Sequence, residues 1–224
     1  MKIIAHIKTD FKEKFGIPRQ SGLAEETLGK IVFEKEYRVR EAFRGLEEFS
    51  HIWILWNFSE AERENWSPTV RPPLLGGNKR MGVFATRSPF RPNPIGLSCV
   101  RLEKVEYSKE EGPVLYVRGA DLMDTTPIYD IKPYLAYADS YPDAVGGFTE
   151  NLSERKVEVR IENDSFYKIP EEKQKEIISI LQHNPAPSYK EDGKIYTMDY
   201  GDYEIKFHIR DNILYLISVY GFTT

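Results

Sequence analysis

The run Leu97-Ser98-Cys99-Val100-Arg101-Leu102-Glu103-Lys104-Val105 decides the fold class. Val100, Leu102 and Val105 alternate imperfectly with charged residues, a pattern typical of a half-buried strand. Helical periodicity is scarce in the same part of the chain, where residues 38–48 form one short candidate helix. Further short runs rich in Ile, Val, Leu and aromatic residues predict strands at residues 3–7, 28–33, 51–58, 81–86 and 114–118.

Many short strands joined by Gly/Pro turns favour a barrel or sandwich over a sheet with crossover helices. We therefore predict a mainly β protein with a β-barrel-like N-terminal domain at residues 1–147. The turn-rich segment 141–147 and the polar residues that follow it predict a domain boundary near residues 147–155. Residues 148–224 are predicted to form a small α+β C-terminal domain, with a helix after Pro170 and a hairpin turn at Asp211-Asn212.

Composition excludes several classes of protein. The chain has 224 residues, one cysteine and a formal net charge of −4, so neither an internal disulfide nor a cysteine zinc cluster is possible. The four histidines show no metal-ligand spacing, and we expect no metal site. Charged residues follow Met1 too soon for a signal peptide, and no run approaches the roughly 20 apolar residues of a membrane span. We expect a cytoplasmic protein without membrane contact.

Residues 65–102 contain no Asp or Glu but six basic side chains, among them Arg71, Arg80 and Arg87. A local basic patch on a chain of negative net charge indicates one anionic or electron-rich ligand bound at one place. The alternative is a solvated basic loop, and charge alone does not decide between the two.

Three segments carry residues suited to a binding site. Arg87 to Leu97 holds three prolines within six residues, which makes a rigid loop with several free backbone groups. Lys14 to Gly22 is a second short Pro/Gly loop, with Arg19 as a planar donor. In the third, Asp130, Lys132 and Tyr134 would share one face of an extended segment. The alternatives are a stiff connector for the first loop and a surface ion pair for the last segment.

Together these segments resemble the TrmO (TsaA-like, formerly YaeB) family of S-adenosylmethionine-dependent tRNA methyltransferases. The likeness covers nearly all of residues 1–140 and extends more thinly to the end of the chain. The matching stretches are Lys12 to Gln20, Gly45 to Trp53, Arg71 to Asn78, Gly82 to Gly96 and Asp130 to Tyr134.

The resemblance implies a β-barrel methyltransferase that acts as a homodimer, with S-adenosylmethionine as cofactor and tRNA as partner. The implied reaction is methylation of the exocyclic nitrogen of N6-threonylcarbamoyladenosine, 3′ of the anticodon in threonine tRNA. Ser59 and Glu60 stand where relatives carry His-Gln, and Thr125 where the family often has Gly. The implied cofactor contacts are Pro18, Arg19, Gln20, Ser59, Glu60, Arg87, Leu97, Asp124, Thr125, Thr126 and Pro127.

We assign tRNA contacts to Lys132, Tyr134 and Tyr189, the last within an element at Asn184 to Tyr189 that resembles one in the family. We expect the C-terminal domain to engage tRNA and not to build the cofactor site. A poor nitrogen nucleophile needs a nearby carboxylate to take its proton. Asp130 is our first candidate for that base, followed by Asp124 or Asp121.

Two other function classes remain open from the sequence. One is a barrel that binds S-adenosylmethionine or RNA without catalysis. The other is a methyltransferase that acts on a small molecule or a protein. Methyl transfer from the bound donor would distinguish a tRNA methyltransferase from a non-catalytic barrel. The identity of the methyl acceptor would distinguish it from a methyltransferase that acts on a small molecule or a protein.

Overall fold

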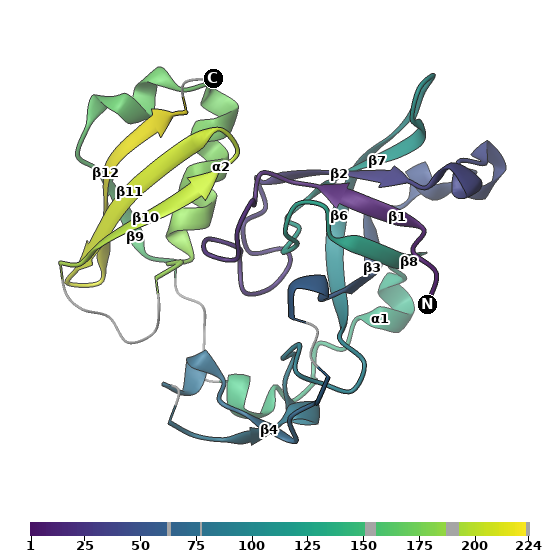
Figure 1. The fold of residues 1–224 in the computed structure, drawn as a ribbon, viewed down its shortest axis with the longest axis horizontal. Coiled ribbons are helices and arrows are strands. Elements are labelled where there is room, and N and C mark those ends of the chain that lie inside the picture. The colour runs from purple at the N-terminus through teal and green to yellow at the C-terminus, as the bar shows by residue number, and fades with distance from the viewer. Residues whose placement is uncertain (62–63, 77, 151–155, 187–192, 223–224) are drawn as a thin grey trace.

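The computed structural model describes residues 1–61, 64–76, 78–150, 156–186 and 193–222. A closed antiparallel barrel forms the N-terminal part, and a four-stranded sheet with one helix forms the C-terminal part (Figure 1). Around the barrel the strands follow the order β1 (Ala5–Lys8), β2 (Leu28–Phe33), β7 (Gly112–Arg118), β6 (Ile95–Ser108), β3 (His51–Asn57) and β8 (Pro127–Pro133).

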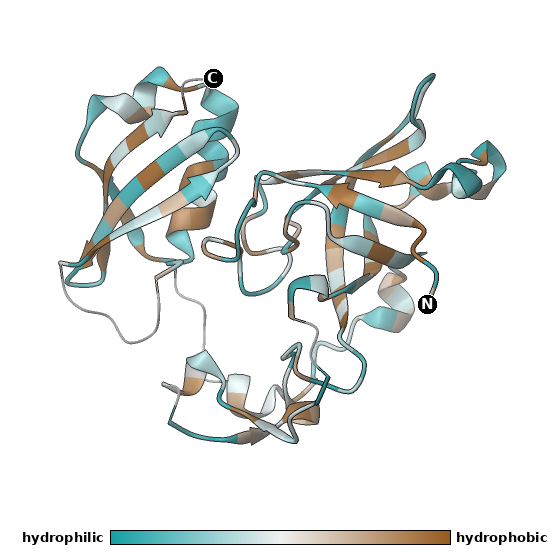
Figure 2. Cartoon of the chain, viewed as in Figure 1, coloured by the Kyte–Doolittle hydropathy of each residue, from teal (hydrophilic) through white to brown (hydrophobic). Residues whose placement is uncertain are grey.

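The alternation along β6 explains why the sheet closes. Gly96, Ser98, Val100 and Leu102 are buried in the barrel, whereas Leu97 and the other intervening residues are more exposed. Because side chains of a strand alternate between its two faces, one face of each strand lines the interior. Figure 2 shows the resulting hydrophobic bands along the barrel strands. The interior is filled by a cluster that includes Ile7, Ile31, Ile52, Ile54, Leu115 and Val117.

Two local predictions are wrong. Residues 38–48 form short 3-10 turns rather than a helix, because Gly45 takes a left-handed φ of 83° and Arg44 is extended. The predicted strand 81–86 is only two residues long, β5 (Met81–Gly82), and pairs with β4 (Thr69–Val70). A 3-10 turn at Val83–Ala85 follows it. This short ribbon lies apart from the barrel in Figure 1. A short helix, α1 (Ala136–Asp139), follows the last barrel strand.

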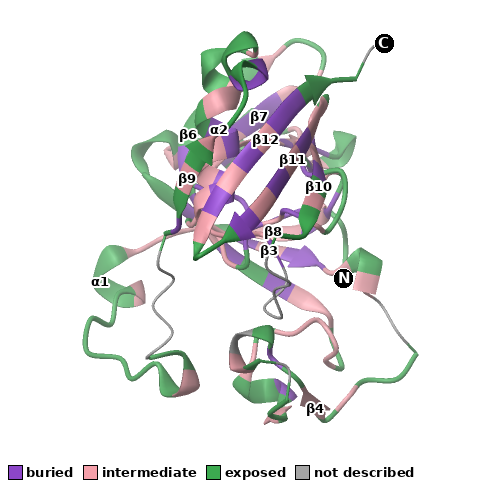
Figure 3. Cartoon of the chain, turned by 90° about the vertical axis from the view of Figure 1, so that its left-hand side faces the viewer, coloured by how far each residue is buried: buried purple, intermediate pink, exposed green. Residues whose placement is uncertain are grey.

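The C-terminal sheet has the strand order β10 (Ile195–Tyr200), β11 (Tyr203–Arg210), β12 (Ile213–Gly221) and β9 (Glu158–Ile161). Only β9 runs parallel to its neighbour, β12. Helix α2 (Glu171–Gln182) buries Ile177, Ile180 and Leu181 in the same core as the sheet. Asp211 and Asn212 both have positive φ, as the predicted two-residue hairpin requires. Figure 3 shows the alternation of buried and half-buried residues along β11 and β12 of this sheet.

The long loop between β1 and β2, residues 9–27, leaves the barrel and reaches the C-terminal part (Figure 1). Phe11 and Ala24 of this loop are buried in the hydrophobic core formed by the C-terminal sheet and α2. The β1–β2 loop therefore packs into the core of the C-terminal part, and this core is a separate cluster from the core of the barrel.

Within the described residues, no helix has the length and apolar character needed to cross a membrane. The same part of the chain contains no group of three or more His, Cys, Asp or Glu side chains arranged to hold a metal ion.

Candidate active site

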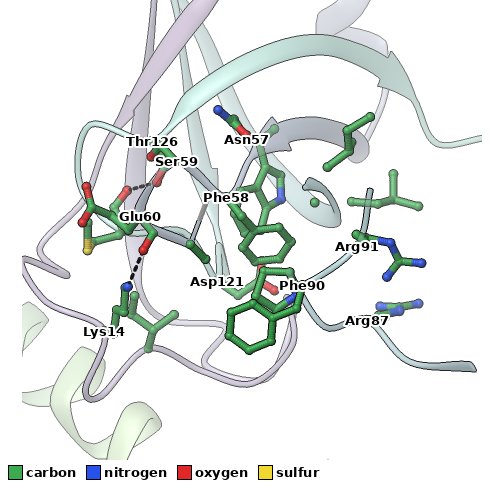
Figure 4. A pocket seen from close by; sticks show the side chains of 18 of the residues that line it. Lys14, Asn57, Phe58, Ser59, Glu60, Arg87, Phe90, Arg91, Asp121 and Thr126 are labelled. Atoms are coloured by element: carbon green, nitrogen blue, oxygen red, sulfur yellow. Dashed lines mark hydrogen bonds between the residues drawn. The ribbon is translucent and has the colours of Figure 1, made fainter. Parts of the chain in front are cut away.

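A cavity of about 670 Å³ lies where three loops meet one end of the barrel. It is bounded by the β1–β2 loop, the segment after β3 and the proline-rich loop before β6 (Figure 4). The structure thus brings together segments that the sequence places up to 112 positions apart, from Lys14 to Thr126. Of the residues we expected to contact a cofactor, those that line the cavity are Pro18, Arg19, Gln20, Ser59, Glu60, Arg87, Leu97 and Thr126.

Three expected cofactor residues lie outside this lining. Asp124 and Thr125 face a second hollow of about 360 Å³. The Asp124 carboxylate accepts from the backbone N–H of Thr9 at 3.0 Å and pairs with Lys12 Nζ at 2.9 Å. Thr125 has a left-handed φ of 64°, a conformation that favours glycine. Pro127 is the first residue of β8.

Of the residues we assigned to catalysis and tRNA contact, Asp130 and Lys132 lie on β8, Tyr134 follows β8 directly, and none of the three lines the cavity. Asp130 and Lys132 do share a face, since they form an ion pair at 2.9 Å with both side chains well exposed. Tyr134 packs on the rings of His51 and Trp53, with centroids 6.2 and 5.9 Å away. Tyr189 lies outside the described residues.

Two contacts join the loops around the cavity. The exposed guanidinium of Arg87 donates to the side-chain oxygen of Gln20, which connects the proline-rich loop to the β1–β2 loop. Lys14 Nζ donates to the backbone carbonyl of Glu60 at 2.7 Å (Figure 4). Arg91 has a different role, because its guanidinium donates to the carbonyls of Thr86 and Ser88 at 3.0 and 3.2 Å and braces its own loop.

A hydrogen-bonded chain runs from the buried residues Trp56 and Ser98 to the half-buried Asp121, and Trp56 and Asp121 line the cavity. Trp56 Nε1 donates to Ser98 Oγ at 2.9 Å, and Ser98 Oγ donates to the Asp121 carboxylate at 2.5 Å. Burial raises the pKa of Asp121, and the hydrogen bond from Ser98 and the charge of Arg87 only partly offset that rise. A carboxylate with a raised pKa that lines a cavity is a candidate for proton transfer.

The sequence indicated Asp121 only as a later candidate, and it did not indicate Trp56 or Ser98. Trp56 and Ser98 meet because β3 and β6 pair in the register that sets Trp56 opposite Gly96, and Asp121 reaches Ser98 from the segment between β7 and β8. A large aromatic residue opposite a glycine is the signal that could have indicated these residues, but it is recognised only once the pairing of β3 with β6 is known. Two further aromatic side chains, Phe58 and Phe90, line the same cavity (Figure 4).

Gly96→Ala tests the importance of this close approach. A Cβ at Gly96 would lie 2.5 Å from Trp56 Cδ2, so the indole ring must move. We expect unfolding free energy to fall by about 1–3 kcal/mol, the usual cost of overpacking. Thermal and urea denaturation would measure the loss. Gly82→Ala is the matched control, because a Cβ there meets no atom within 4 Å. Equal stability of the two variants would contradict the prediction.

A wider groove of about 1520 Å³ adjoins the cavity and shares Arg19, Gln20 and Arg87 with it. Arg71 and Arg80 also line this groove. At its side the exposed rings of Trp66 and Phe84 stack with centroids 5.9 Å apart. The groove therefore combines positive charge with exposed aromatic surface.

The fold and the site define a β-barrel protein with a cavity at one end of the barrel that combines arginine side chains, aromatic rings and a carboxylate. The chain belongs to the TrmO family: the family model described as tRNA-methyltransferase O N-terminal domain matches residues 6–140.

Curated relatives agree with this membership. The tRNA (adenine(37)-N6)-methyltransferase of Escherichia coli K12 is 41% identical over 217 residues, which cover 93% of this chain and 92% of the relative. A putative S-adenosylmethionine-dependent methyltransferase, RcsF, of Pseudomonas aeruginosa PAO1 is 37% identical over 229 residues, covering 97% and 96%. A crystal structure of TrmO from Pseudomonas aeruginosa superposes with a TM-score of 0.79 at 32% identity, covering 98% of this chain and 97% of that one.

Proposed function

We propose that the protein transfers a methyl group from S-adenosylmethionine to N6 of threonylcarbamoyladenosine, 3′ of the anticodon in threonine tRNA. The coarser part of this statement follows from the family: the chain is an S-adenosylmethionine-dependent tRNA methyltransferase. The observation that carries the proposal is the cavity at the barrel end, which gathers Arg19, Gln20 and Arg87 beside aromatic rings and the half-buried carboxylate of Asp121.

The residues present fit the donor. Arg19 and Arg87 are forked donors suited to a carboxylate, and the rings of Phe58 and Phe90 suit the face of an adenine. The negative charge of Asp121 complements a cationic ligand. When bound, the donor supplies a sulfonium methyl group that needs no further activation. The contribution of the protein is therefore largely alignment, which rigid loops provide.

Methyl transfer also requires that the acceptor nitrogen lose its proton, and alignment of donor and acceptor does not remove it. The nitrogen is a poor nucleophile, because its lone pair is shared with the purine ring and the carbamoyl group. Asp121 is the described carboxylate with a raised pKa in the cavity lining, and we propose it as the base that accepts this proton. Asp130 remains the competing candidate, although it forms an ion pair with Lys132 and lies outside the cavity lining.

We further propose that the wider groove receives the anticodon loop. Arg71 and Arg80 would contact phosphates, and the exposed Trp66–Phe84 pair would stack on an unpaired base.

We also propose that the protein works as a cytoplasmic homodimer. The exposed apolar side chains of Tyr137, Tyr141 and Val145 offer a surface for self-association, which light scattering would test.

The decisive experiment incubates purified protein with labelled donor and threonine tRNA, followed by mass spectrometry of the nucleosides. We expect N6-methylated threonylcarbamoyladenosine, and donor binding by calorimetry that EDTA leaves unchanged. The same tRNA without the threonylcarbamoyl group is the matched control. Equal methylation of the control would overturn the finer substrate assignment. Donor binding without transfer to any tRNA would indicate the non-enzymatic binding barrel.

A further inference from the structure

We propose that the C-terminal sheet holds the β1–β2 loop in the conformation that binds the methyl donor, so the C-terminal domain is a positioning part of the donor site. We expected this domain to remain separate from the cofactor site. The packing of residues 10–17 favours a direct connection instead. The inference rests on the proposed donor site, because it assigns donor contacts to Arg19 and Gln20.

Apolar side chains of the loop lie in the core of the C-terminal domain. Phe11 is only 2% exposed and packs edge-on against Tyr200, with ring centroids 5.1 Å apart. Phe15 packs against Tyr196 and Phe207, at 6.3 and 6.4 Å. Because the barrel's own core is a separate cluster, these rings are fixed by the C-terminal sheet and not by the barrel.

Ile17 connects that core to the cavity. Its side chain is packed against the C-terminal core, and the same residue lines the donor cavity. Pro18, Arg19 and Gln20 follow directly in the chain and line the cavity as well. A proline restricts the residue before it, so the position of Ile17 is passed on to Arg19 with little freedom. Loss of the anchor would therefore misplace the donor contacts.

Polar contacts fix the start of the loop at the same interface. The backbone carbonyl of Asp10 accepts from Gly201 N at 2.8 Å, and its carboxylate pairs with Lys173 of α2. Lys173 also pairs with Glu176 at 2.7 Å, and Tyr200 donates to Glu176 at 2.9 Å. Although burial alone would lower it, the pKa of Lys173 is raised because both carboxylates stabilise its charge. Lys173 therefore stays charged, and its ion pair with Asp10 holds the start of the loop to α2.

Gly16 offers a precise test of the anchor. A Cβ there would lie 2.8 Å from Met198 Cγ and closer still to its sulfur, and Met198 is itself buried in β10. Gly22 is a matched control in the same loop. Its φ of 81° resembles the 93° of Gly16, but a Cβ at Gly22 meets nothing within 4 Å. The two Gly→Ala variants therefore share the backbone strain and differ in the contact with the C-terminal domain.

The experiment measures donor dissociation constants and steady-state constants for the full-length variants. We expect Gly16→Ala to weaken donor binding and raise the donor KM by about tenfold or more, which corresponds to about 1.4 kcal/mol or more of binding free energy. The KM for tRNA should stay near that of the wild type. Gly22→Ala should change donor affinity much less. Met198→Ala combined with Gly16→Ala should recover part of the loss, which a double-mutant cycle quantifies.

Equal donor affinity of folded Gly16→Ala and Gly22→Ala would overturn the inference. If Gly16→Ala does not fold, Phe15→Leu decides, since it removes the ring contacts with Tyr196 and Phe207 while keeping an apolar side chain. Unchanged donor affinity in Phe15→Leu would then contradict the proposal. Failure of the wild-type protein to bind donor would instead contradict the proposed function, so the two failures are distinguishable.

Discussion

Asp121→Asn is expected to lower kcat by about 10²–10⁴-fold, the range typical for loss of a general base. The substitution preserves the shape of the side chain and removes its charge. The amide can still accept from Ser98 Oγ, so the chain to Trp56 is kept. Donor affinity should therefore change far less than turnover, which calorimetry and single-turnover kinetics would separate.

The pH profile provides an independent readout of the same group. A base acts only when it is ionised, so turnover of the wild-type enzyme should fall as the pH drops through the pKa of Asp121. Burial raises that pKa above the ordinary value, and the acidic limb should lie above the usual carboxyl range near pH 3.9. Asp121→Asn should lose this limb. Ser98→Ala should move it to higher pH, because the hydrogen bond from Ser98 lowers the pKa of Asp121.

Asp130→Asn is the matched control, since it makes the same change outside the cavity lining. Asp130 is exposed and paired with Lys132, so we expect turnover within about twofold of wild type, well short of a general base's contribution. The reverse result, a large loss in Asp130→Asn and little change in Asp121→Asn, would assign the base to Asp130. Large losses in both would point to a role in tRNA positioning for the β8 face.

The barrel could be predicted from sequence because its strands carry their own signal. Residues 28–33 match β2, and the alternation around Val100 and Leu102 marks the centre of β6. The strand pattern at residues 81–86 gave a wrong prediction because a strand also needs a partner strand to pair with. The apolar run at 81–86 meets only the two-residue strand β4 and then turns, so it has no partner along most of its length.

The site was predictable only in part, for a physical reason. Arg19, Gln20 and Arg87 lie on Pro/Gly loops whose composition is visible in the sequence, and the structure brings them to one cavity. No local pattern selects Asp121, because its hydrogen-bond partner Ser98 lies 23 residues away on β6 and only the folded barrel brings the two side chains together. The contact between Phe15 and Phe207 crosses from the barrel loop to the C-terminal sheet, and no local pattern predicts it.

Arg87→Lys is expected to weaken donor binding by about 10–100-fold, because a charged hydrogen bond contributes about 1.5–3 kcal/mol. Lysine keeps the charge but cannot reproduce the planar fork of arginine. The guanidinium of Arg87 donates to Gln20 from the opposite loop, so it both faces the cavity and closes its rim. Lysine would lose at least one of these two contacts. Calorimetry of donor binding measures the effect.

Stability distinguishes this role from a structural one. Because Arg87 is exposed, the melting temperature of the Arg87→Lys protein should remain nearly that of the wild type. Arg91→Lys should instead lower the melting temperature, because Arg91 braces the carbonyls of Thr86 and Ser88. Arg101→Lys is the matched control: Arg101 is exposed on β6, pairs with Glu103 at 2.7 Å and lies outside the cavity lining. If Arg87→Lys and Arg101→Lys bound donor equally well, Arg87 would have no part in holding it, and the Gln20 contact would serve only to join the two loops.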